Sequence, residues 1–131
     1  MNLLLDTHIW IWLTLAPDRL TRKVARSLDD TSNELCLSPI SVWELLTLCR
    51  KGRLFLNEDP VLWAKHSFER LALEEAPLTT EVAMETASLS QVHSDPADCL
   101  IAASAKVFDL TLVTADQKLI AEPGIKILAN R

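Results

Sequence analysis

Hydrophobic residues in this chain form short continuous runs that are separated by longer segments with helical spacing. Short, largely apolar segments with the length of strands buried on both faces of a sheet occur at residues 2–5, 34–37, 111–114 and 126–128. Residues 76–78 form a further, shorter candidate. The pattern therefore predicts four to five short strands.

Helices are predicted between these runs, and three of them have an explicit start signal. In each of the three, a residue that can cap a helix is followed by proline, which is favoured at the first helical position: Ser38 and Pro39, Asp59 and Pro60, Asp95 and Pro96. These helices are expected to run to a stop at Gly52, to about Leu73 and to about Asp109. Further helices are predicted at residues 7–16, 21–28, 80–92 and 117–121.

The alternation of strands and helices indicates the fold class. Parallel strands need crossover connections, and helices supply these while they cover both faces of the sheet. We therefore expect a three-layer α/β/α sandwich around a mostly parallel sheet of four to five strands. The 131 residues show no repeat or flexible linker, which favours a single domain over residues 1–131. Ligands of such folds bind beyond the carboxyl ends of the strands.

Composition excludes several classes of site. The two glycines, Gly52 and Gly124, are too far apart for a Walker A loop or a dinucleotide fingerprint. The three cysteines have no CxxC spacing and no cleavable leader is visible, so we expect a reducing cytoplasm. The three histidines form no HExxH pattern, which argues against zinc. The longest apolar stretch, residues 9–15, is well short of the roughly 20 residues that span a membrane.

Four carboxylates are candidates for function. Asp6 and Asp116 follow the ends of two predicted strands, so both are expected at the rim where ligands bind. Glu44 is flanked by apolar residues inside a predicted helix, and Asp98 lies in the first turn of another. Each also has a purely structural explanation. Asp6 and Asp116 can cap helices, Asp98 can interact with a helix dipole, and Glu44 can lie on a narrow exposed stripe.

A parallel sheet would bring these four acids to one rim, and that coincidence favours a functional explanation. Clustered carboxylates repel one another unless a cation lies among them. Oxygen ligands without Cys or His select a hard divalent cation, Mg²⁺ or Mn²⁺. Without the four acids, the formal net charge of −5 becomes −1, so most of the charge that opposes nucleic-acid binding belongs to the predicted metal site.

Four segments resemble the PIN-domain family, and more narrowly the toxin ribonucleases of VapBC toxin–antitoxin pairs. They are LLLDTHIWIWL at residues 3–13, SVWELLTLCRKGRL at 41–54, HSDPADCLIAASA at 93–105 and LTLVTAD at 110–116. The resemblance covers nearly the whole chain. It implies a Mg²⁺- or Mn²⁺-dependent endoribonuclease, usually a homodimer, that is held inactive by a cognate VapB-like antitoxin. Contact with DNA would then occur only through the antitoxin.

The resemblance also implies roles for individual residues. The family's acidic quartet corresponds to Asp6, Glu44, Asp98 and Asp116. Asp95 matches an accessory acid, while Thr7 and Thr114 match hydroxyl positions that orient the acids or their waters. His93 lies where histidine is common in this subgroup, although a polar loop residue explains it equally well. Many relatives have arginine where this chain has Cys99, a departure that bears on substrate affinity rather than on metal binding.

The predicted mechanism is metal-assisted hydrolysis of an RNA phosphodiester, which needs no side-chain nucleophile. Two alternatives stay open. One is a Mg²⁺-dependent phosphatase with Asp6 as nucleophile, although His8 stands where a DxD motif would have its second acid. The other is a non-catalytic interaction module on the same scaffold. A receiver domain is disfavoured because adjacent acids after the first strand are missing. The four tryptophans fit core or interface packing better than base stacking.

Overall fold

The central sheet is entirely parallel. The structure is a computed structural model that describes residues 1–90 and 95–131. Within these ranges, five strands form one sheet in the order β3-β2-β1-β4-β5. The strands are β1 (Asn2–Leu5), β2 (Glu34–Leu37), β3 (Glu74–Glu75), β4 (Thr111–Thr114) and β5 (Lys126–Ala129). The predicted α/β/α fold with a mostly parallel sheet is thereby confirmed.

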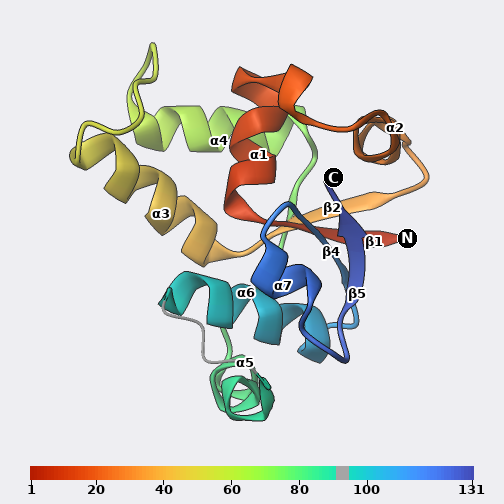
Figure 1. The fold of residues 1–131 in the computed structure, drawn as a ribbon. Helices are drawn as coiled ribbons and strands as arrows, with labels where there is room; N and C mark the ends of the chain where they lie inside the picture. The colour runs from red at the N-terminus through yellow and green to blue at the C-terminus, as the bar shows by residue number, and fades with distance from the viewer. Residues whose placement is uncertain (91–94) are drawn as a thin grey trace.

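Helices cover both faces of the sheet (Figure 1). They are α1 (Thr7–Leu15), α2 (Arg22–Asp29), α3 (Pro39–Arg50), α4 (Pro60–Arg70), α5 (Thr80–Glu85), α6 (Pro96–Val107) and α7 (Gln117–Ile120). Two short 3₁₀ turns, η1 (Pro17–Arg19) and η2 (Thr86–Ser88), complete the described elements. None of these helices is both long and apolar enough to cross a membrane.

The core consists of two clusters, one on each face of the sheet. Because successive strand residues point to opposite faces, Leu3 and Leu5 of β1 join one cluster while Leu4 joins the other. Helices α1 to α4 contribute to the first cluster, with Trp10 among its largest fully buried side chains. Helix α6 contributes Ile101 and other residues to the second. Burial on both faces accounts for the unbroken apolar sequence of β1.

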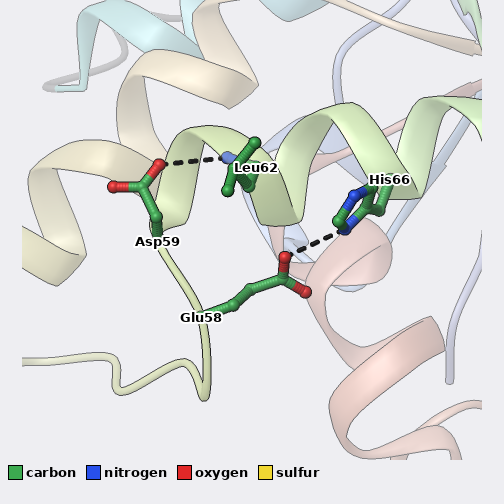
Figure 2. A network of polar contacts seen from close by, with 4 residues as sticks. All are labelled: Glu58, Asp59, Leu62 and His66. Atoms are coloured by element: carbon green, nitrogen blue, oxygen red, sulfur yellow. Dashed lines mark hydrogen bonds and ion pairs between the residues drawn. The ribbon is translucent and has the colours of Figure 1, made fainter.

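The three cap–proline pairs start helices where the sequence predicts them. Ser38, Asp59 and Asp95 each accept a hydrogen bond from a backbone amide in the first turn of α3, α4 and α6. Figure 2 shows this for α4, where the Asp59 carboxylate accepts from the Leu62 amide at 3.2 Å and Glu58 pairs with His66 at 2.9 Å. The cap contacts of Ser38, Asp59 and Asp95 satisfy backbone amides that have no partner inside the helix.

The prediction of one helix over residues 80–92 is wrong for the residues that the structure describes. Helix α5 ends at Glu85, and the 3₁₀ turn η2 follows it. The hydroxyls of Thr86 and Ser88 donate to the carbonyls of Ala83 and Glu85, and such local bonds compete with continued helix. Residues 91–92 of the predicted helix lie outside the described residues.

The short strand predicted at residues 76–78 lies two residues earlier, at Glu74–Glu75. The Ala76 amide still donates to the Leu37 carbonyl of β2 at 2.9 Å, but β2 ends at Leu37 and Ser38 caps α3, so the partner strand does not continue beside residues 77–78. Helix α4 also ends earlier than predicted, at Arg70. Two residues later, Ala72 has a positive φ of 50°, a left-handed conformation that ends a helix.

Candidate active site

A pocket of about 350 Å³ lies at the carboxyl ends of the central strands, and five carboxylates line it. Asp6 directly follows β1 and Asp116 follows β4, the strand that pairs with β1. Helix α3 supplies Glu44, while Asp95 and Asp98 come from the start of α6. The structure thus brings the four acids of the predicted quartet, and the accessory acid Asp95, to one pocket.

Asp6 is buried, with 6% of its surface exposed, and both of its oxygens accept hydrogen bonds. Oδ1 accepts from the Thr7 amide at 2.8 Å, so Asp6 does cap α1. Oδ2 accepts from the Thr114 hydroxyl at 2.7 Å. Thr114 is itself fully buried at the end of β4. Its hydroxyl also accepts from the Asp116 amide at 3.0 Å, and it therefore connects two acids of the pocket.

Glu44 is held by a network of hydroxyl groups. The Thr7 hydroxyl donates to Glu44 Oε1, and Thr7 Oγ1 lies 2.8 Å from Ser41 Oγ. A hydroxyl carries one proton and accepts through its lone pairs. Both contacts are therefore satisfied when Ser41 donates to Thr7 and Thr7 donates to an ionised Glu44. Ser41 and Thr7 are buried, so this network fixes the direction of the Glu44 side chain.

The capping explanations of two further acids also hold. Asp116 Oδ1 accepts from the Lys118 and Leu119 amides at 2.8 and 3.2 Å, which caps α7. Asp95 Oδ1 accepts from the Ala97 amide at 2.9 Å at the start of α6. Capping uses Oδ1 in each case, and both side chains still line the pocket. A structural and a chemical role are thus compatible for the same carboxylate.

Burial and crowding act most strongly on Asp98. Burial, followed by the charges of Asp6, Asp95, Asp116 and Glu44, raises the pKa of Asp98 from its usual 3.8 to about 7. Burial also raises the pKa of Asp6, against hydrogen bonds from Thr114 and Thr7 that lower it. For Glu44, burial raises the pKa more than the Thr7 hydroxyl lowers it. Burial and the neighbouring carboxylates therefore disfavour the ionised forms of these three acids in the folded protein.

The donor chemistry of the pocket fits a hard divalent cation, but the side chains are not closed around one. Carboxylate oxygens are the ligands that Mg²⁺ and Mn²⁺ prefer. Within residues 1–90 and 95–131, no group of three or more Asp, Glu, His or Cys side chains is arranged to hold a metal ion. Oxygens of Asp6, Glu44 and Asp116 accept hydrogen bonds from donors of the protein. An ionised carboxylate has about four acceptor sites, so these hydrogen bonds leave lone pairs that could face a cation.

Two features of this pocket are not predicted from the sequence. Ser41 precedes Glu44 by three residues, which places both on one helix face, but the pairing with Thr7 depends on how α1 and α3 pack. His8 and Trp12 also line the pocket, and their spacing of four residues on α1 was the available signal. His93, a further candidate, lies outside the described residues.

Comparisons with known proteins place this chain in a family. A model of the family described as PIN domain matches residues 3–124. The chain is similar to Ribonuclease VapC22 of Mycobacterium tuberculosis (strain ATCC 25618 / H37Rv), with 31% identity over 119 residues that cover 90% of this chain and 89% of the relative.

Solved structures show the same fold. A chain in the crystal structure of DNA-bound VapBC from Salmonella typhimurium superposes with a TM-score of 0.72 and 23% identity, covering 100% of this chain and 99% of that chain. A chain of FitAcB from Neisseria gonorrhoeae has a TM-score of 0.63 and 26% identity, with coverage of 98% and 97%. The extent of the family match, the identity to a curated relative and the shared fold together show that this chain belongs to the PIN-domain family.

Proposed function

We propose that this chain is a metal-dependent endoribonuclease that acts as the toxin of a toxin–antitoxin pair. The observation that carries the proposal is the convergence of five carboxylates on one pocket at the carboxyl ends of β1 and β4. The name of the 31% identical relative, a ribonuclease, supports the choice of RNA as the substrate. The reaction is hydrolysis of a phosphodiester, with attack by water in line with the departing 3′ oxygen.

Asp6, Glu44, Asp98 and Asp116 are the residues that would hold Mg²⁺ or Mn²⁺ in this pocket. When bound, the cation supplies positive charge that stabilises the attacking and leaving oxygens of the phosphodiester. The protein's own contribution is orientation. Thr114 holds Asp6 through Oδ2, and the Ser41–Thr7 pair holds Glu44. Hydroxyl partners of this kind fix the direction of metal-ligating carboxylates in many proteins.

The test is cleavage of labelled RNA by the pure protein in Mg²⁺ or Mn²⁺, with and without EDTA. We expect cleavage in the presence of metal and its loss in EDTA. Asp98→Asn and Asp6→Asn should each abolish most of the activity, because each removes a charged ligand. Glu81→Gln is a matched control, since Glu81 is an exposed acid on α5 outside the pocket. Cleavage that survives both EDTA and the two pocket variants would refute the metal-nuclease proposal.

A partner protein forms part of the proposal. Several solved structures that resemble this chain are toxin–antitoxin complexes, including one from Klebsiella pneumoniae. On this chain, an apolar hollow of about 480 Å³ lies between α3 and α4, lined by Val42, Leu46 and Phe68 among others. Exposed apolar surface of this kind marks protein contacts. An antitoxin encoded beside this chain should co-purify with it and inhibit RNA cleavage. A homodimer of the free toxin is a separate prediction, and sedimentation of the pure protein tests it.

The two alternative functions receive less support. A phosphatase with Asp6 as nucleophile usually needs a second acid two residues later, and His8 holds that position in this chain. A non-catalytic module has no need of five acids in one pocket, because their mutual repulsion is a cost to stability. Hydrolysis of p-nitrophenyl phosphate in the same metal series distinguishes the phosphatase from the nuclease.

A further inference from the structure

One wall of the acidic pocket is aromatic rather than acidic. His8 and Trp12 both line the pocket together with the carboxylates. The two residues are four apart on α1 and therefore project from the same face of the helix. Their ring centroids are 5.9 Å apart, and the ring planes are tilted by 50°. His8 is exposed and Trp12 is partly exposed, and both residues belong to the pocket lining.

An arginine holds the Trp12 ring in place. The Arg19 guanidinium lies over the Trp12 ring, 4.7 Å from its centroid, in a cation–π contact. The segment that carries Arg19 is anchored to the carboxyl end of the sheet. The Arg19 carbonyl accepts from Asn130 Nδ2 at 3.1 Å, and Asn130 Oδ1 accepts from the Thr21 amide at 2.7 Å. The indole is thus positioned before any ligand arrives, which reduces the entropy cost of binding. Because Arg19 covers one face of the ring, a base can stack only on the opposite face.

Core packing alone does not account for this arrangement, as comparison with a second tryptophan on the same helix shows. Trp10 is fully buried, its Nε1 donates to Ser67 Oγ at 2.8 Å, and its ring lies 5.4 Å from that of Trp63. Trp10 therefore has the surroundings of a core residue. Trp12 also packs against this core cluster, but it combines that contact with partial exposure, a cation over its ring and a place in the wall of the acidic pocket.

We propose that Trp12, flanked by His8, is a stacking site for a base of the RNA strand beside the phosphodiester that is cleaved. The inference rests on the proposed ribonuclease function, because that function places a phosphate among the carboxylates of the same pocket. Single-stranded nucleic acid is commonly bound by stacking bases on aromatic rings, and this needs no hydrogen bonds to the base edge. The subsite therefore tolerates every base but prefers purines, whose larger rings overlap the indole more fully.

The test combines protein variants with RNA that lacks a single base. The assay measures cleavage of a set of oligoribonucleotides, each with one abasic position, by the wild type and by Trp12→Leu. The leucine keeps apolar bulk but has no aromatic face. For the wild type, we expect one abasic position next to the cleavage point to raise KM by on the order of tenfold, with little change in kcat. In Trp12→Leu this penalty should disappear, and Trp12→Phe should restore most of it.

Trp43→Ala is the matched control, because Trp43 is 56% exposed on α3 but does not line the pocket. This variant should keep the wild-type abasic penalty. The proposal is overturned if Trp12→Leu keeps the full penalty while its unfolding temperature matches that of Trp12→Phe. It is equally overturned if Trp43→Ala removes the penalty to the same extent.

A second measurement separates failure of this subsite from failure of the ribonuclease function. RNA that contains 5-iodouridine is irradiated with the protein in Mg²⁺, so that the cation offsets repulsion between the carboxylates and the phosphate, and the cross-linked peptide is identified by mass spectrometry. A cross-link to the peptide that carries Trp12 supports the stacking site even if no cleavage is observed. Cross-links confined to other peptides contradict it, even if metal-dependent cleavage is confirmed.

Discussion

Asp98 shows how one residue can report on the whole pocket. Its pKa of about 7 results from burial first and from four neighbouring carboxylates second. Its position in the first turn of α6 is readable from the sequence, because Asp95 and Pro96 mark the helix start. Its surroundings are not readable in this way, since they depend on which strands and helices pack beside it. The raised pKa of Asp98 therefore cannot be predicted from the sequence alone.

The raised pKa of Asp98 predicts a specific pH dependence of stability in the absence of divalent cations. The folded-state pKa of about 7 lies above the usual 3.8, so the unfolded state loses this proton at lower pH than the folded state. The Asp98 contribution to the free energy of unfolding therefore falls as the pH rises from about 4 to about 7. Asp98→Asn, which cannot ionise, should be more stable than the wild type at pH 8, by about 1 kcal/mol after solvent screening.

Urea denaturation of both proteins in EDTA, at pH 5 and pH 8, measures this effect. The stability difference between Asp98→Asn and the wild type should grow with pH across that interval. A difference of the same size at both pH values would show that the ionised Asp98 is not destabilised by its neighbours.

The hydroxyl network predicts a graded effect on activity. Thr7→Val removes the hydroxyl that donates to Glu44 and leaves Ser41 without this partner. RNA cleavage should fall by about ten- to a hundredfold, the usual cost of losing a partner that orients a metal ligand. Thr7→Ser keeps the hydroxyl and should retain most of the activity. Ser41→Ala leaves the Thr7–Glu44 hydrogen bond intact and should have an intermediate effect on RNA cleavage. Equal losses of activity in Thr7→Val and Thr7→Ser would contradict the proposed role of the Thr7 hydroxyl.

At the scale of elements, local signals predict starts better than ends. Helices α3, α4 and α6 begin at their prolines, as the cap–proline pairs predict, because cap and proline act within a single turn. The end of α4 and the break after Glu85 were not predicted. Both depend on competing hydrogen bonds and on a left-handed residue, Ala72, that no strong sequence signal marks. The shift of β3 depends on its pairing with β2.

The cap of α4 allows a test at this scale. Asp59→Ala removes the side chain that accepts from the Leu62 amide and should lower the free energy of unfolding by about 1 kcal/mol. Asp59→Asn preserves a cap acceptor and should be close to the wild type. Thermal unfolding of the two variants measures the difference. RNA cleavage should be unaffected by either, because Asp59 does not line the acidic pocket. Equal stability of Asp59→Ala and the wild type would mean that this cap contributes nothing.

At the scale of the whole molecule, the sheet order assembles the pocket. Pairing of β1 with β4 places Asp6 beside Thr114 and brings Asp116 to the same edge, although more than a hundred residues separate the two strands' ends. The sequence indicates which acids follow strands, and the parallel topology implies a common edge. The strand order and the inward direction of Glu44 come only from the packed structure. The roles of these acids in catalysis and metal binding stay predictions.

The central claim is that this acidic pocket binds a divalent cation, and Mn²⁺ binding measured by electron paramagnetic resonance tests it most directly. Titration of the wild type and of Asp98→Asn at pH 7.5 counts free Mn²⁺ without reference to any substrate. We expect saturable binding to the wild type and at least about tenfold weaker binding to Asp98→Asn, with Glu81→Gln matching the wild type. Mn²⁺ binding of equal strength in the wild type, Asp98→Asn and Asp6→Asn, or no saturable binding at all, would contradict the account.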